Sequence, residues 1–149
     1  MTTIPNTIKK LAEEVLKELD MYSKEAVDLI VATGKAETGY RHLEQMGGGP
    51  ALGFFQIEKN TIDDVLKNYA GYRPHVMNAL LEFGLKQGDV YFSVVSNIAL
   101  QIAFCRICYW RVPEPIPKNL EAMAHYWKEH YNTKGGKGTV EHFLKANKG

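Results

Sequence analysis

The stretch VYFSVVSNIALQIAFCRICYW, residues 90–110, contains the longest apolar run of the chain and decides the fold class. Its apolar residues fall on nearly all sides of a helix, which is typical of a helix buried inside a protein core. Polar side chains interrupt the run at Ser96, Asn97, Gln101 and Arg106. The run is therefore too short and too polar to span a membrane. We expect one long helix, capped by Asp89, at the centre of a mainly α-helical fold.

The flanking segments repeat apolar residues at intervals of three and four, which predicts further helices packed around the central one. Capping residues and prolines predict where these helices begin: Pro5, Ser23, Thr61, Pro74, Asn119 and Thr139. The helix opened by Asn119 is expected to run through Tyr131 and to end at the glycines of residues 135–138. Residues 38–57 are rich in glycine and should form mostly loop with a small, irregular β element. No repeat or linker divides the chain, so residues 1–149 are expected to form a single domain.

The composition is that of an ordinary globular protein of 149 residues, 45% hydrophobic and 23% charged. A formal net charge of +1 argues against a nucleic-acid partner, because such proteins usually carry a concentrated basic face. The small size and near-neutral surface suit a monomer. The N-terminus lacks the apolar stretch of a secretory signal, so we expect a protein without stable membrane insertion. Cys105 and Cys108 are expected to be small buried residues rather than a zinc or redox site.

Glu37 is the side chain on which the functional prediction depends. It follows an apolar helical segment and precedes the glycine-rich loop, so it should lie at a helix end that faces a cleft. Breaking a glycosidic bond requires a proton on the leaving oxygen. A carboxylic acid supplies it near neutral pH only if burial in an apolar cleft disfavours its ionised form. On position alone, a solvated surface carboxylate is the more common outcome.

Four motifs occur in the same order as in soluble lytic transglycosylases, members of the lysozyme-like superfamily that cut the glycan of bacterial cell walls. They are Glu37-Thr38, Gly53-Phe54-Phe55-Gln56, Asn97-Ile98, and Tyr131-Asn132 followed by Gly135 and Gly136. The chain resembles this family over nearly its whole length, and residues 37–42 look most like bacteriophage-encoded members. The resemblance implies a lysozyme-like single domain whose cleft lies beside the glycine-rich loop.

The resemblance also implies the reaction. The protein would cleave the β-1,4 bond between N-acetylmuramic acid and N-acetylglucosamine in peptidoglycan, with Glu37 as general acid and afterwards as base. In the family, the N-acetyl group and the C6 hydroxyl of the muramic sugar take the place of a second carboxylate, so that the product carries an anhydro ring. No metal and no cofactor are expected.

The remaining site residues are carried over from the family motifs as substrate-binding residues. Gln56 would lie beside the cleaved bond and contact sugar groups. Phe54 and Phe55 stand where the family has Leu-Met and would form an apolar wall against the substrate. Tyr131 would hold the catalytic carboxylate, and Asn132 would shape the cleft wall.

Two alternatives to a transglycosylase stay open. A hydrolase of the same fold, a muramidase, would need a second carboxylate, and four candidates are near the motifs: Glu44, Glu58, Asp63 and Asp64. A catalytically inert glycan-binding virion component would keep the fold without the chemistry. In either enzymatic case we expect an endolysin held in the host cytoplasm until release, or a virion-associated enzyme, acting on the cell wall in the periplasm.

Overall fold

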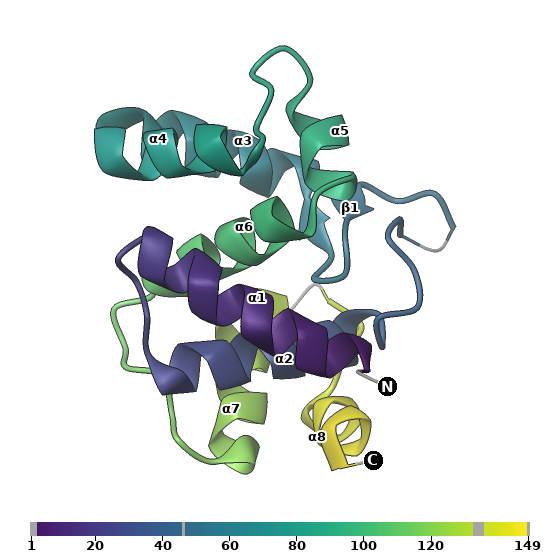
Figure 1. Ribbon diagram of the computed structural model, residues 1–149. Helices are drawn as coiled ribbons and strands as arrows, with labels where there is room; N and C mark the ends of the chain where they lie inside the picture. Colours follow the sequence, from purple (N-terminus) through teal and green to yellow (C-terminus); the bar gives the residue numbers. More distant parts are fainter. Residues whose placement is uncertain (1–2, 46, 133–135, 149) are drawn as a thin grey trace.

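The computed structural model describes residues 3–45, 47–132 and 136–148, and within these ranges the fold is mainly α-helical (Figure 1). In chain order the helices are α1 (Ile4–Glu18), α2 (Lys24–Glu37), α3 (Lys59–Asn68), α4 (Pro74–Phe83), α5 (Val90–Val95), α6 (Ile98–Trp110), α7 (Leu120–Trp127) and α8 (Val140–Lys148). A short 3-10 helix, η1 (Ala70–Tyr72), follows α3, and a π-helical turn, η2 (Lys128–Asn132), follows α7. The two-residue strands β1 (Ala51–Leu52) and β2 (Ile57–Glu58) pair antiparallel in the glycine-rich segment, which confirms the predicted small β element.

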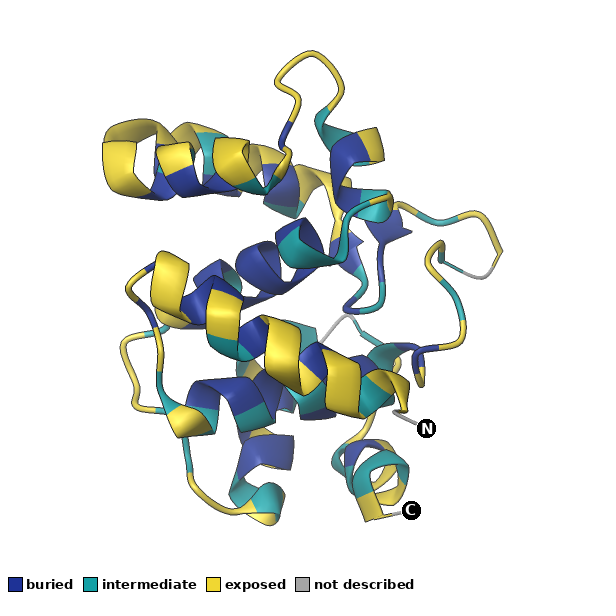
Figure 2. Ribbon diagram, in the orientation of Figure 1, coloured by how far each residue is buried: buried dark blue, intermediate teal, exposed yellow. Residues whose placement is uncertain are grey.

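Helix α6 forms the centre of the core, as its apolar sequence predicted (Figure 2). Every residue from Leu100 to Ile107 is buried, and the helix contacts α1, α2, α3, α4, α5 and η2. Its two cysteines are free thiols, with Cys105 buried and Cys108 half-buried. No helix in the described part of the chain is long and apolar enough to cross a membrane.

The prediction of one helix over residues 90–110 was wrong, because the chain breaks there into α5 and α6. Asn97 makes the break. Its Oδ1 accepts a hydrogen bond from the backbone N–H of Leu100 at 3.1 Å, and its Nδ2 donates to the carbonyl of Phe83 at 2.7 Å. An Asn side chain that bonds the backbone in this way competes with the regular helical pattern and favours a cap. Asp89 precedes α5, but its side chain makes no capping hydrogen bond.

Helix α2 carries Glu37, and side-chain hydrogen bonds hold its start and its middle in place. Ser23 caps its start as predicted, accepting from the backbone N–H of Ala26 at 3.0 Å. In the middle, the fully buried hydroxyl of Thr33 lies 2.8 Å from the hydroxyl of Tyr109 on α6. The Thr33 hydroxyl already donates to the Leu29 carbonyl at 2.7 Å, so it accepts from Tyr109, and another rotation of α2 against α6 would leave the buried Tyr109 hydroxyl without this partner.

The other predicted helix starts hold except that of α3, and the predicted end of α7 does not hold. Helices α4 and α8 begin directly at or after Pro74 and Thr139, as expected. Helix α3 begins at Lys59, before Thr61 and without a side-chain cap. Helix α7 ends at Trp127 instead of continuing in α-helical form through Tyr131, and the chain changes there to the π-helical turn η2. Gly135, expected to help end this helix, lies outside the described residues.

Candidate active site

Glu37 is the last residue of α2, at the helix end where the sequence placed it. Its side chain is half-buried, and its Oε2 accepts a hydrogen bond from Nε1–H of Trp127 at 2.9 Å. The Trp127 side chain is only 1% exposed and packs against Phe143 of α8, with ring centroids 5.2 Å apart. The carboxyl group is therefore held by a donor that cannot itself move, which preorganises its direction.

Burial raises the pKa of Glu37 from 4.5 to about 7, because the surroundings disfavour the ionised form. Hydrogen bonds from Trp127 and Asn132 lower the pKa and partly offset this rise, as do the charges of His142 and Lys128. Desolvation is the larger effect. A carboxylic acid with a pKa of about 7 is protonated in a substantial fraction at neutral pH, which is what a general acid needs.

The π-helical turn explains how Trp127 and Asn132 both reach Glu37. Residues five positions apart lie on different faces of an α-helix, whereas a π-helix hydrogen-bonds from i to i+5 and brings them onto one side. Nζ of Lys128 donates to Oδ1 of Asn132 at 2.9 Å, which leaves the amide nitrogen as the group that Asn132 offers to the carboxyl. Single π-helical turns are frequent at functional sites, and this one shapes the wall of the site.

His142, on α8, also lies at the end of α2. Its Nε2 lies 2.7 Å from the carbonyl oxygen of Ala36. A carbonyl only accepts, so Nε2 carries the hydrogen and donates. This carbonyl is one of the last four of α2, which have no partner within the helix. The contact thus completes the end of α2 and brings a titratable ring beside Glu37, where its positive charge lowers the pKa of the carboxyl.

The loop motif at residues 53–56 is bonded directly to the end of α2. The hydroxyl of Thr38 donates to the carbonyl of Phe54 at 2.8 Å, and the buried Gln101 of α6 accepts from the Phe54 backbone N–H at 3.0 Å. Gln56 adopts a left-handed backbone with φ of 51°, and its Nε2 donates to the carbonyl of Gly53 at 2.9 Å. A non-glycine residue in that region is strained and is held only by surrounding contacts. Two motifs far apart in sequence therefore meet as one unit.

Two surface hollows meet at Glu37. The polar hollow has a volume of about 620 Å³ and is lined by Gln45, Ala51, Gln56, Glu58, Trp127, Tyr131, Asn132 and residues 136–138. The basic hollow has a volume of about 730 Å³ and is lined by Thr3, Pro5, Asn6, Lys35, Thr38, Gly39, Tyr40, Arg41, His42 and Ala146. Ala36, Glu37 and His142 line both. A ligand longer than one hollow would therefore pass the carboxyl group of Glu37.

The expectation that Tyr131 holds the carboxylate was wrong. Its hydroxyl donates to the carbonyl of Phe55, and its ring stacks on Tyr109 of α6 with centroids 5.0 Å apart. The widening of the helix at η2 turns Tyr131 toward the loop and the core while Trp127 takes the carboxylate. Tyr131 still lines the polar hollow together with Gln56, so it supports the loop rather than the acid.

The expectation that Phe55 contacts substrate was also wrong, since its side chain is fully buried. Phe54 is half-buried and packs edge-on against Tyr40, with ring centroids 5.3 Å apart. Neither phenylalanine lines the polar hollow. The hydrogen bonds that Phe54 makes through its backbone turn the pair inward, so both rings support the loop from beneath.

Of the four candidates for a second carboxylate, Glu58 alone lines the polar hollow with Glu37. Glu58 directly precedes α3, and its side chain is exposed. Glu44 is exposed in the preceding loop and lines neither hollow. Asp63 accepts from the hydroxyl of Tyr91 with both oxygens, at 2.8 and 2.7 Å.

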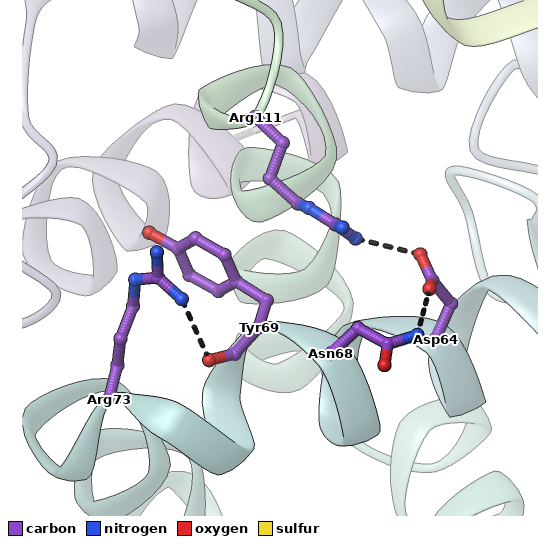
Figure 3. Close-up of polar contacts among 5 residues, drawn as sticks. All are labelled: Asp64, Asn68, Tyr69, Arg73 and Arg111. Carbon is purple, nitrogen blue, oxygen red and sulfur yellow. Dashed lines mark hydrogen bonds and ion pairs between the residues drawn. The ribbon is translucent and has the colours of Figure 1, made fainter.

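Asp64 instead takes part in structural contacts between α3 and the end of α6 (Figure 3). Its Oδ2 accepts from Arg111 at 2.7 Å, and its Oδ1 accepts from Asn68 at 2.7 Å. These contacts join α3 to the end of α6, and beside them the guanidinium of Arg73 lies over the ring of Tyr69 at 3.9 Å. The hydrogen bonds from Asn68 and Arg111 lower the pKa of Asp64, so this carboxylate stays ionised.

Among the described residues, one group of three side chains could offer ligand atoms to a metal ion: Glu114, Glu129 and His130. Nε2 of His130 lies 3.1 Å from Oε2 of Glu114, so an ordinary ion pair accounts for the arrangement. The group does not include Glu37 or any other residue that lines the polar hollow or the basic hollow.

Three residues of the site were not predicted in these roles: Trp127, Gln101 and His142. Trp127 belongs to none of the four sequence motifs. No local signal could have singled out its contact with Glu37, because that contact depends on how α7 crosses the end of α2. A buried glutamine in an apolar helix is a weak signal for a tertiary hydrogen bond, and Gln101 fits it. No sequence signal identifies His142 as a residue of the site.

Comparisons of the chain with protein-family models, with curated proteins and with solved structures find no match.

Proposed function

We propose that the protein is a peptidoglycan-cleaving glycosidase of lysozyme-like fold, with Glu37 as its general acid. One observation carries the proposal: a half-buried carboxyl group, its pKa raised to about 7, is held by Trp127 where two hollows meet. Glycoside cleavage is the reaction that most directly uses such a group, since it needs a proton on the leaving oxygen at neutral pH. The resemblance of the ordered motifs around Glu37, Gln56 and Tyr131 to those of lytic transglycosylases supports peptidoglycan as the glycan.

The contacts of the carboxyl group suit both halves of an acid–base cycle. Oε2 accepts from Trp127, so the proton to be donated resides on Oε1. After transfer to the glycosidic oxygen, the new carboxylate is stabilised by Trp127 and Asn132 and by the charges of His142 and Lys128. Each of these lowers the pKa of Glu37, which means that each favours the ionised form. The carboxylate then takes back a proton as the base of the second step.

For that second step we propose transglycosylation, in which the C6 hydroxyl of the muramic sugar attacks the anomeric carbon and loses its proton to Glu37. The proposal is supported by the motif order and by the position of Gln56 in the same hollow as Glu37. The second candidate is hydrolysis by a muramidase. It is favoured by Glu58, which lines that hollow with an exposed carboxylate able to activate water.

The similarity of residues 37–42 to phage-encoded enzymes supports a related proposal about the setting. The protein would be an endolysin or a virion-associated enzyme that acts on the bacterial wall from the periplasmic side. As an endolysin it would accumulate in the host cytoplasm before release.

The test is digestion of purified peptidoglycan by wild type and by Glu37→Gln, with mass spectrometry of the soluble fragments. Glu37→Gln keeps the shape of the side chain, so it should fold normally and lose activity by about 10³-fold, within the range for loss of a general acid. Anhydro-muramic ends from wild type establish the transglycosylase, and reducing ends establish the hydrolase and direct attention to Glu58. Activity retained by Glu37→Gln overturns the assignment of the acid. Wall binding without fragments from either protein would favour the inert virion component.

A further inference from the structure

The basic hollow differs in charge from the polar hollow on the other side of Glu37. It is lined by four basic side chains, Lys35, Arg41, His42 and His142, and among the described residues that line it Glu37 is the one acidic side chain. The polar hollow instead presents amide groups, both Glu37 and Glu58, and fewer basic groups. The hollow takes these groups from the end of α2, the loop that follows it and the helix α8, and residues at the start of α1 also line it.

The two permanent cations of this hollow have no acid partner within the described part of the chain. Neither Lys35 nor Arg41 takes part in an ion pair there. Lys35 lies in the last turn of α2, where the helix dipole favours a cation. That effect does not extend to Arg41, which is exposed in the following loop and lies on the same hollow. The charges therefore remain available to an anionic ligand.

We propose that the basic hollow binds the carboxylates of the stem peptide attached to the muramic sugar. This inference rests on the proposed function, because it assumes that a glycan strand lies across Glu37. The peptide leaves the strand at the muramic sugar, next to the bond to be cut, so a receptor for it must adjoin the catalytic acid. The hollow that shares Ala36, Glu37 and His142 with the polar hollow meets that requirement. A guanidinium and an ammonium group together match carboxylates in geometry and charge.

The experiment compares two substrates: glycan strands that carry stem peptides, and the same strands stripped of peptides by an amidase. The variant Lys35→Gln/Arg41→Gln removes both cations, and Lys10→Gln/Lys67→Gln removes two exposed cations that line neither hollow. We expect wild type and the control to prefer peptide-bearing strands in kcat/KM by about fivefold, the effect of two partly screened charge pairs. In Lys35→Gln/Arg41→Gln this preference should fall to near unity. Raising the salt concentration should weaken it in wild type as well.

A binding measurement separates failure of this inference from failure of the proposed function. In a Glu37→Gln background, peptide-bearing and peptide-free disaccharides are titrated with and without the two basic side chains. Tighter binding of the peptide-bearing sugar, lost with Lys35 and Arg41, supports the inference even if wild type cuts neither strand. Equal affinity for both sugars, or a preference that survives removal of both cations, overturns it.

Discussion

Two carboxylates next to the central helix have opposite fates. Glu37 ends α2 and Asp64 lies in α3, and both helices pack on α6. The pKa of Glu37 is raised to about 7 by burial, whereas the pKa of Asp64 is lowered, first by the hydrogen bond from Asn68 and then by Arg111. The same chemical group thus keeps part of its protons at neutral pH in one place and is held in its ionised form in the other.

The difference lies in the partners that each carboxylate meets when its helix packs. Asp64 stays at the surface, 48% exposed, and meets a guanidinium that never loses its charge. Glu37 is withdrawn from water and meets a neutral indole N–H at 2.9 Å, which directs it without fully compensating its charge. The raised pKa of Glu37 therefore reflects incomplete compensation of its negative charge, not the number of its contacts.

The largest effect expected from this contrast is on stability as a function of pH. Glu37 has a pKa of about 7 in the folded protein against an ordinary 4.5, so the fold keeps a proton that the unfolded chain releases. Its contribution is present in full below about pH 4.5, declines as the pH rises and is lost above about pH 7. The shift corresponds to about 2 to 3 kcal/mol for a half-buried group. Glu37→Gln, neutral throughout, should therefore gain that much over wild type between acid and mildly alkaline pH.

Urea unfolding of wild type and Glu37→Gln across this pH range measures the gain. The free energies of unfolding should diverge as the pH rises. Asp64→Asn provides the matched control, because folding shifts the pKa of Asp64 in the opposite direction to that of Glu37. Parallel curves for wild type and Glu37→Gln would mean that Glu37 is solvated, and the proposed acid would lose its physical basis.

A smaller effect is expected when the donor to Glu37 is removed. Trp127→Phe deletes the Nε1–H that lowers the pKa of the carboxyl, so the pKa rises and the alkaline limb of the pH–activity profile moves to higher pH. Loss of orientation should also reduce kcat by about tenfold, a moderate case of misplacement of a catalytic group. The cost in stability should be about 1 to 3 kcal/mol, since Trp127 is in the core.

Two variants show whether the effect is specific to that hydrogen bond. Trp110→Phe changes the other tryptophan, which is 46% exposed and lines neither hollow beside the acid, and should leave the profile where it is. Tyr131→Phe removes the hydroxyl that bonds the Phe55 carbonyl and should cost about 1 kcal/mol of stability without moving the alkaline limb. A shift with Tyr131→Phe and none with Trp127→Phe would restore the role that the family motif suggested for Tyr131.

The contrast between the two carboxylates was only partly visible in the sequence. The position of Glu37 at a helix end, before a glycine-rich loop, followed from local rules of capping and glycine conformation. The central helix followed from its apolar residues. These features depend on neighbours in the chain, which a sequence displays directly.

The break at Asn97, the π-helical turn and the choice of Trp127 over Tyr131 depend on tertiary packing instead. Asn97 suits a cap, but an apolar run on both sides also suits an unbroken helix, and the bond to Phe83 decides between them. In the same way, no local sequence signal distinguishes Asp64 from Asp63. The two residues differ because Arg111, at the end of α6, donates a hydrogen bond to Asp64. The sequence can therefore identify Glu37 as a candidate acid. The pKa of Glu37, however, depends on residues that only tertiary packing brings next to it.

The smallest expected effect tests the other half of the comparison. Asp64→Asn removes the charge that faces Arg111 while keeping a side chain that can accept from Asn68 and Arg111. Because the pair is exposed, the loss of stability near neutral pH should be about 0.5 kcal/mol or less and should shrink further in high salt. The lowered pKa of Asp64 means that this loss appears above its ordinary pKa and vanishes as the pH falls through the folded value. Cleavage should keep the wild-type rate and pH profile, measured on the same peptidoglycan, since Asp64 lines neither hollow. A large loss of activity with intact folding would instead give Asp64 a part in the chemistry, and the two carboxylates would then have to be considered together as an acid and its partner.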